Sequence, residues 1–336
     1  MNLLSRLLIL VISLHASMSR AQPFDPAPKM LRVMTWNVEW MFDDYQGDNR
    51  SDLSREQSSP SKEFWQAKLG GVAEVIASAQ PEIVALQEIE GKQTLADIAA
   101  ELKSKHQLAY RFAFIEGSDS FTEQDVGLLV RGSLINYRRL EQSKAMFDSE
   151  QFYNLSKHLV AEFRWDELDS PLTVMTVHLR ATPEAEELRT RQAKLARFWL
   201  TPQLQAGEDV ILLGDFNSEH AALELQSTEA PVGDVAAIVD SGGDDRMVDL
   251  LSHLPNRQQS THLVLDKQFD RIYASESMLV DGPGQDWVFE KIEILADAVV
   301  RGKRDGQEHW HERLTMPIAE LDLSDHLPVV ATFRRK

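Results

Sequence analysis

The 336-residue chain contains no cysteine, and this absence excludes several kinds of structure at once. A lipoprotein anchor, a disulfide framework and a metal site built from thiolates all require cysteine side chains. The folded protein must therefore rely on its hydrophobic core or on bound ions. Apolar residues make up 43% of the chain, an ordinary share that is enough for a sizeable core.

Long hydrophobic runs are also missing, except at the N-terminus. Met1 to Arg6 carries positive charge, Leu7 to Leu14 is almost wholly apolar, and Ser19-Arg20-Ala21 has small residues at the two positions that a signal peptidase reads. We therefore expect residues 1–21 to be a secretory signal peptide and residues 22–30 to be a proline-rich lead-in. The chain then predicts a secreted or periplasmic bacterial protein, a monomer with no stable membrane association.

Positive charge is scarce, since the chain has 35 Lys and Arg residues but 53 Asp and Glu residues, which gives a net charge of -18. This balance argues against a protein that grips nucleic acid by bulk electrostatic attraction. It does not exclude an enzyme that approaches a polyanion through bound metal ions, because these reverse the local charge. We interpret the acidic balance as a means of staying soluble in salty surroundings.

The chain has no internal repeat of fixed period and no linker that would divide it, so we predict one α/β domain with layered sheets over residues 31–336. Helices are predicted after Ser61, over residues 94–105 and from Thr182-Pro183 onward, and the polar residues 43–60 are predicted to form a surface loop. Strands are predicted over residues 31–38, 82–86, 110–115, 126–130, 134–140, 158–165, 172–179, 210–213, 269–273, 292–296 and 327–333.

The most informative stretch is VILLGDFN, at Val210 to Asn217. Its four apolar residues indicate a strand buried on both faces, which Gly214 ends. Asp215 and Asn217 follow at once, at the carboxyl end of the strand, where open α/β sheets bind their ligands. These two residue types are equally typical of a turn or a helix cap, so the stretch alone decides nothing.

Polar residues of a matching kind occur at other predicted strand ends. Each has an ordinary explanation by itself: a helix N-terminal acid, a hydrogen-bonded core histidine or a turn residue. Together they are harder to dismiss, because each buried polar group would have to be satisfied separately. The set comprises Asn37, Glu39, Glu88, His178, Asp215, Asn217, Asp325, His326 and, within an otherwise apolar strand, Asp270.

Metal-assisted attack on a phosphate ester is the chemistry that uses these residue types together. Carboxylate oxygens suit magnesium, which keeps some waters and takes further oxygens from a substrate phosphate. Histidines supply acid or base groups near neutral pH. An asparagine amide can donate to a phosphoryl oxygen as negative charge moves onto it.

Six motifs give the chain a resemblance to the endonuclease/exonuclease/phosphatase superfamily, which includes deoxyribonucleases, apurinic endonucleases, inositol polyphosphate 5-phosphatases and bacterial sphingomyelinases. They occur in family order from about Leu31 to the C-terminus. The ordered set is specific for the superfamily but not for a substrate. The motifs are TWNVEW (35–40), PEIVALQE (81–88), TVHL (176–179), GDFN (214–217), FDRI (269–272) and SDHLPV (324–329).

The resemblance implies a four-layer sandwich, in which two mixed β-sheets pack face to face with helices on the outside, and a metal site at one edge. Glu88 would be the principal ligand of Mg²⁺, with Mn²⁺ or Ca²⁺ as alternative ions. Asn37 would lie beside it, and Asp325 would complete the site directly or through water. Glu39 stands where relatives vary and is expected as a second ligand. Whether one metal or two would act is left open.

The resemblance also implies catalytic roles. His326 would activate the attacking water and would be oriented by Asp270, as a carboxylate orients a catalytic histidine. Asp215 and Asn217 would position the nucleophile and bind phosphoryl oxygens. His178 would contact the phosphate or protonate the leaving oxygen.

One cluster stays outside this scheme. Glu308, His309, His311 and Glu312 surround Trp310 and either bind an additional metal ion or have no shared role. Their spacing matches no standard zinc pattern.

We predict a secreted, magnesium-dependent phosphodiesterase, a nuclease of low sequence specificity with nucleic acid as its substrate. A phosphomonoesterase of a small phosphorylated solute would use the same residues and is the first alternative. A lipid phosphodiesterase of the sphingomyelinase type should carry an exposed aromatic hairpin, and no paired aromatics indicate one. A non-catalytic binding protein is disfavoured, because all the acid, base and ligand positions are filled.

Overall fold

The structure, a computed structural model, describes residues 24–336 except 169, 224–226, 228, 240–245, 281–285 and 318. The predicted signal peptide, residues 1–21, and the first two residues of the lead-in lie outside the described part. Among the described residues, no helix combines the length and the apolar character needed to cross a bilayer.

In the described part of the chain, twelve strands form two six-stranded sheets. The first has the order β11-β12-β1-β2-β4-β3 and the second the order β5-β6-β7-β8-β10-β9. Their bounds are β1 Met30–Met41, β2 Ile83–Ile89, β3 Arg111–Ala113, β4 Asp125–Val130, β5 Leu134–Arg138, β6 His158–Phe163, β7 Leu172–His178, β8 Asp209–Asp215, β9 Met247–Asp249, β10 Asp270–Ser275, β11 Trp287–Ile294 and β12 Val329–Arg335.

Both sheets are mixed. β1 pairs in parallel with β2, and β7 pairs in parallel with β8, whereas the other neighbouring strands are antiparallel. The described helices are α1 Asp52–Gln57, α2 Lys62–Ala79, α3 Lys92–His106, α4 Lys144–Asp148, α5 Glu186–Gln205, α6 Gly233–Val239, α7 Ala296–Val299 and α8 His309–Glu312, with 3-10 turns at Pro183–Ala185, Leu250–His253, Asn256–Gln258 and Glu276–Met278.

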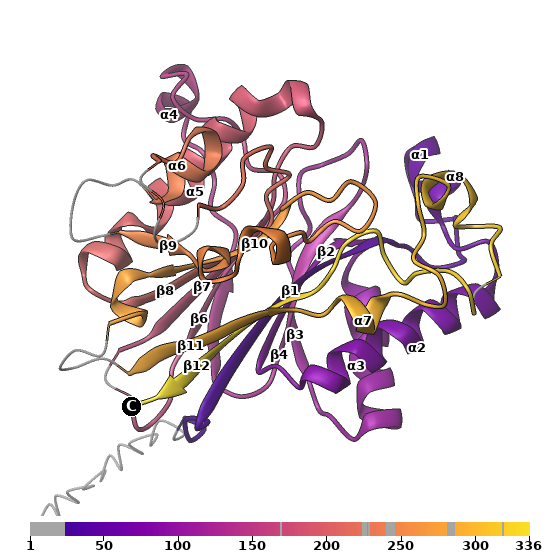
Figure 1. Ribbon diagram of the computed structural model, residues 1–336, viewed down its shortest axis with the longest axis horizontal. Helices are drawn as coiled ribbons and strands as arrows, with labels where there is room; N and C mark the ends of the chain where they lie inside the picture. The colour runs from indigo at the N-terminus through magenta and orange to yellow at the C-terminus, as the bar shows by residue number, and fades with distance from the viewer. Residues whose placement is uncertain are drawn as a thin grey trace, which may run out of the picture.

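The sheets pack face to face, with α2 and α3 outside the first sheet and α5 and α6 outside the second (Figure 1). Neighbouring residues of a strand point to opposite faces, and here both faces are covered. In β8, for example, Ile211 joins the core between the sheets, whereas Val210 and Leu212 pack beneath α5. This is why the central strands are almost continuously apolar. The four-layer sandwich implied by the resemblance is confirmed.

Most predicted elements are present, with differences at their ends. The predicted surface loop at 43–60 contains helix α1. Ser51 caps this helix by accepting the Ser54 N–H at 3.0 Å, and a buried hydrogen bond of 2.8 Å from Asn49 to Ser58 holds the segment together. The strand predicted at 292–296 starts earlier, since it is the end of β11. A 3-10 turn at Pro183–Ala185 precedes helix α5.

Candidate active site

The predicted polar strand ends meet at one edge of the sandwich. The side-chain amide of Asn37, near the end of β1, donates to Glu88 Oε1 at 3.0 Å and to Asp215 Oδ2 at 2.9 Å. Glu88 belongs to β2 and Asp215 ends β8, so one amide links both sheets. One layer deeper, Gln87 accepts from Thr35 at 3.2 Å and donates to Thr176 of β7 at 3.2 Å. These bonds fix the spacing of the two sheets beside the site.

A glycine allows β7 and β8 to end side by side. Gly214 has a φ of +145°, and a Cβ atom there would lie 1.9 Å from the carbonyl oxygen of Val177. Only glycine fits at this close approach of the two backbones. The next pair in register is His178 opposite Asp215. As a result, His178 Nε2 lies 3.5 Å from Asp215 Oδ2 and 3.9 Å from Glu88 Oε1.

His326 and Asp270 form a buried pair, in which His326 Nδ1 lies 2.7 Å from Asp270 Oδ2. The other ring nitrogen, Nε2, lies 3.8 Å from Asp215 Oδ2 and 3.9 Å from Asp325 Oδ1. The loop that carries His326 is tied to β1, because Ser324 Oγ accepts the His326 N–H at 3.0 Å and donates to the Asn37 carbonyl at 2.8 Å. This is the geometry that the predicted role of Asp270, orienting the ring of His326, requires.

Opposite charges set the ionisation of the site. Burial alone would lower the pKa of His326, but the carboxylates of Asp270, Asp215 and Asp325 hold this pKa well above its usual range. Burial would raise the pKa of Asp215, but His326, His178 and the hydrogen bond from Asn37 hold it below its usual range. His178 has a pKa lowered to about 4, first by burial and then by the charge of Lys157, so its ring is neutral at pH 7.

The carboxylates of Glu88 and Asp215 converge with the neutral imidazole of His178. In the described part of the chain, no Lys or Arg side chain lies at hydrogen-bond distance from Glu88. Ligand atoms of Glu88, His178 and Asp215 all lie within 4.8 Å of one another. Glu88 owes its position to an irregularity of β2, where its φ is +61° and the pairing register with β4 shifts between Gln87 and Ile89. The hard carboxylate oxygens of this group fit a divalent ion such as Mg²⁺ or Mn²⁺, with the neutral imidazole of His178 beside them.

Two further groups of possible ligand atoms lie next to the first, and each contains His326. They are His262, Asp325 and His326, and Asp215, Asp270 and His326. Asn37 faces this region through its NH₂ group, because its side-chain oxygen accepts the backbone N–H of Glu39 at 2.9 Å.

Glu39 occupies a different environment from the one expected of a metal ligand. Its Oε2 lies 2.7 Å from His309 Nε2 and accepts the Asp325 N–H at 3.3 Å, while Oε1 lies 3.3 Å from Arg313 Nε. Lys68 donates to its backbone carbonyl. Burial opposes its ionisation, but His309 and Arg313 lower the pKa of Glu39 to about 2. Glu39 therefore serves as the anchor of a buried ion-pair network behind the site.

The residues around Trp310 do not share one site. His309 is fully buried between Glu39 and Asp305, whose Oδ2 lies 2.8 Å from His309 Nδ1. Glu308, His311 and Glu312 are exposed. Within the described ranges, none of these four residues belongs to a group of converging ligand atoms.

Two residues near the site were missed by the sequence reasoning. His262 forms an isolated β-bridge with His326, and the centres of the two rings lie 4.6 Å apart. Trp310 donates its indole N–H to Asp325 Oδ2 at 2.7 Å. No strand end or motif marks either residue, so only the folded arrangement reveals them.

The site opens into a cleft of about 820 Å³. Glu88, His178, Asp215, Asn217 and His326 line one part of it. The cleft also contains basic side chains, and these are Lys157, Arg180 and Lys267. Lys157 is held by Asp119 and Gln124, each at 3.0 Å, and Lys267 pairs with Glu219.

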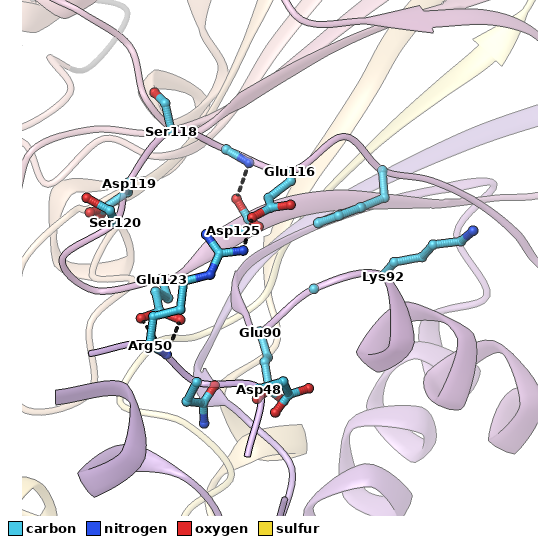
Figure 2. Close-up of a pocket in the computed structure, with 14 residues that line it drawn as sticks. Asp48, Arg50, Glu90, Lys92, Glu116, Ser118, Asp119, Ser120, Glu123 and Asp125 are labelled. Atoms are coloured by element: carbon cyan, nitrogen blue, oxygen red, sulfur yellow. Dashed lines mark hydrogen bonds and ion pairs between the residues drawn. The ribbon is translucent and has the colours of Figure 1, made fainter. Parts of the chain in front are cut away.

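A second hollow of about 420 Å³ adjoins the cleft and shares Ser118, Asp119 and Ser120 with it. Figure 2 shows that carboxylates dominate this hollow, with Arg50 lying between Glu116 and Glu123. Burial, as the largest cause, raises the pKa of both Glu90 and Asp125 to about 7. The number of carboxylates that line this hollow nevertheless makes the surface beside the cleft unfavourable for a long polyanion.

Comparison with known proteins agrees with this geometry. The model of the Endonuclease/Exonuclease/phosphatase family matches residues 34–326. No match was found among curated protein sequences.

Solved structures of similar fold cover most of the chain. The catalytic domain of human Nocturnin, with a bound sulfate anion, has a TM-score of 0.55 and 16% identity, and the match covers 93% of this chain and 97% of that one. TDP2 from D. rerio, complexed with a single-strand DNA product, has a TM-score of 0.54 and 17% identity over 91% and 100%. An endonuclease/exonuclease/phosphatase from Bacteroides vulgatus gives 0.52 and 16% over 92% and 100%.

Proposed function

Because the chain belongs to the endonuclease/exonuclease/phosphatase family and is a phosphoester hydrolase of that family, we propose that it is a metal-dependent phosphodiesterase, a secreted nuclease of low sequence specificity. The observation that carries the proposal is the buried His326–Asp270 pair, which faces Asp215 across the edge where Glu88 and His178 converge. A positioned imidazole beside a cluster of carboxylates is what metal-assisted attack of water on a phosphate requires.

The carboxylates of Glu88, Asp215 and Asp325 would hold the metal ion. When bound, a divalent cation would stabilise negative charge on the phosphate and would offset the carboxylates that raise the pKa of His326. We leave Glu39 out of the ligand set, because His309, Arg313 and the Asp325 N–H occupy both of its oxygens.

The remaining roles fall to side chains of this chain. His326, whose Nδ1 lies 2.7 Å from Asp270 Oδ2, would accept the proton of the attacking water at Nε2. Asn217 donates its backbone N–H to Asp215 Oδ1 at 2.8 Å and its amide to the Leu179 carbonyl at 3.2 Å, which fixes the turn that follows Asp215. Neutral His178 would supply an N–H to a phosphoryl or leaving oxygen.

Nucleic acid is the substrate that we propose. The cleft contains Lys157, Arg180 and Lys267, which suit a phosphate backbone, and a structural relative, TDP2 from D. rerio, is complexed with single-strand DNA. The acidic hollow beside the cleft favours short contacts with the backbone over a long electrostatic track. The same hollow also supports one alternative function, that of a phosphomonoesterase whose small substrate would fit within the cleft.

A substrate panel separates these functions. The mature protein is incubated with plasmid DNA, single-stranded DNA, RNA, a phosphocholine diester and a set of phosphomonoesters, with magnesium or with a chelator. Magnesium-dependent cleavage of the nucleic acids supports the proposal, whereas release of inorganic phosphate from the monoesters alone would replace it. Export is tested separately, since a periplasmic or secreted product should begin at Gln22 on N-terminal sequencing.

A further inference from the structure

The segment between β11 and β12, residues 295–328, contributes side chains that contact Glu39 and Asp325 next to the active site. The segment is fastened internally by Asp322, which accepts the Arg301 N–H at 2.6 Å and the Asp305 N–H at 2.8 Å. Helix α8 is then docked by its ends, since His309 and Arg313 both pair with Glu39 of β1. In Figure 1, α8 lies beside α1, on the same side as the N-terminal part of α2.

This docking brings Trp310 against Asp325. The indole N–H of Trp310 donates to Asp325 Oδ2 at 2.7 Å, a short bond in which the acceptor carries charge when Asp325 is ionised. The Asp325 backbone is held as well, because its N–H donates to Glu39 at 3.3 Å and its carbonyl accepts the Leu263 N–H at 2.6 Å.

His262 holds the same oxygen of Asp325 from another side. Its Nδ1 accepts the backbone N–H groups of Val264 at 3.1 Å and Leu265 at 3.2 Å, so in the neutral ring the proton is on Nε2. That Nε2 lies 3.5 Å from Asp325 Oδ2. A ring in this tautomer has no free lone pair for a metal ion, and its Nε2–H side faces Asp325 Oδ2 in a longer polar contact.

These two contacts, the hydrogen bond from Trp310 and the longer contact with His262, leave one oxygen of Asp325 for the site. Oδ2 faces Trp310 and His262, while Oδ1 lies 3.9 Å from His326 Nε2. The rings of Trp310 and His262 also meet edge to face, with centres 5.9 Å apart, which limits the movement of both. Rotation of the Asp325 side chain would break these contacts.

We propose that Trp310 is a positioning residue, which together with His262 clamps Asp325 so that Oδ1 is presented to the metal ion and the attacking water. The proposal rests on the proposed function, because Asp325 has this task only in a metal-dependent hydrolase. It also gives a role to Trp310, whose neighbours Glu308, His309, His311 and Glu312 were considered in the sequence analysis as ligands of an additional metal ion.

Trp310→Phe tests the clamp, because it keeps an aromatic ring but removes the N–H together with the five-membered part of the indole. Residues that orient a metal ligand typically cost roughly 10- to 100-fold in metal affinity or activity when replaced. We expect a kcat lowered by about that factor, a magnesium titration shifted to higher concentration and a substrate KM that changes little. His311→Ala, an exposed neighbour on the same helix, should behave as the wild type. Unchanged kcat and metal titration in Trp310→Phe would overturn the proposal.

A measurement without turnover separates this proposal from the proposed function. The Trp310 indole N–H resonance, identified by its loss in Trp310→Phe, should lie at low field and should move when Asp325 is replaced in Asp325→Asn. A resonance that stays in place in Asp325→Asn would refute the clamp, whatever the enzyme hydrolyses. If the wild type cleaves none of the panel esters but the resonance moves, the contact is real and the proposed function fails.

Discussion

His309 provides a quantitative test of the buried ion-pair network behind the site. Burial alone would lower its pKa, but Glu39 and Asp305 on either side of the ring raise the pKa of His309 from 6.5 to about 9. A histidine whose pKa is raised by folding stabilises the protein fully below the unfolded value, and this stabilisation is lost as the pH rises through the folded value. With these two pKa values, the linkage relation gives about 2.5 kcal/mol at pH 7 and about 0.4 kcal/mol at pH 9.

The free energy of unfolding from denaturant titrations at several pH values measures this contribution. Lys68 acts in the opposite direction, because burial lowers its pKa from 10.5 to about 8 and so adds stability as the pH rises between these values. The comparison must therefore be made with His309→Gln, which keeps Lys68. The difference between wild type and variant should shrink by about 2 kcal/mol from pH 7 to pH 9. A difference that stays constant would refute the reasoning, and His311→Gln should follow the wild type throughout.

Two further substitutions test how the site is built. Gly214→Ala should lower the free energy of unfolding by about 3 kcal/mol or more, because its Cβ would collide with the Val177 carbonyl. Gly207 has a φ of +72° and open space around it, so Gly207→Ala should lower the free energy of unfolding by only about 1 kcal/mol. Equal costs in denaturant titrations would contradict the close approach of β7 and β8. Glu88→Gln should raise the magnesium concentration for half-maximal activity at least roughly tenfold, while Glu90→Gln in the neighbouring hollow should leave it unchanged. An unaltered titration in Glu88→Gln would remove that residue from the metal site.

The location of the residues that follow buried strands could be read from the sequence. Asn37, Glu88, His178 and Asp215 follow or end apolar runs that belong to parallel strand pairs, and parallel strands end at the same edge of a sheet. The structure brings these four side chains together across the two sheets. This part of the site is encoded locally, by hydrophobic pattern and by the polar residue that interrupts it.

Contacts made by the irregular segment before β12 could not be read from the sequence. Glu39 has a φ of +46°, at a shift in the pairing register of β1, and its carboxylate turns toward His309, 270 positions away along the chain. Trp310 reaches Asp325 in a segment that Asp305 and Asp322 fold back on itself. The docking of α8 on Glu39 completes this approach. Neither contact follows from periodicity, since the segment has no regular strand or long helix to set its direction.

Nicking of supercoiled plasmid by the purified mature protein tests the central claim most directly. Wild type and His326→Ala are compared with magnesium and with chelator, and matched unfolding curves establish that both are folded. The account predicts nicking that requires magnesium and is about 10²- to 10⁴-fold slower in His326→Ala, the usual contribution of a positioned acid or base. Nicking that persists at the wild-type rate in His326→Ala or in chelator would contradict it.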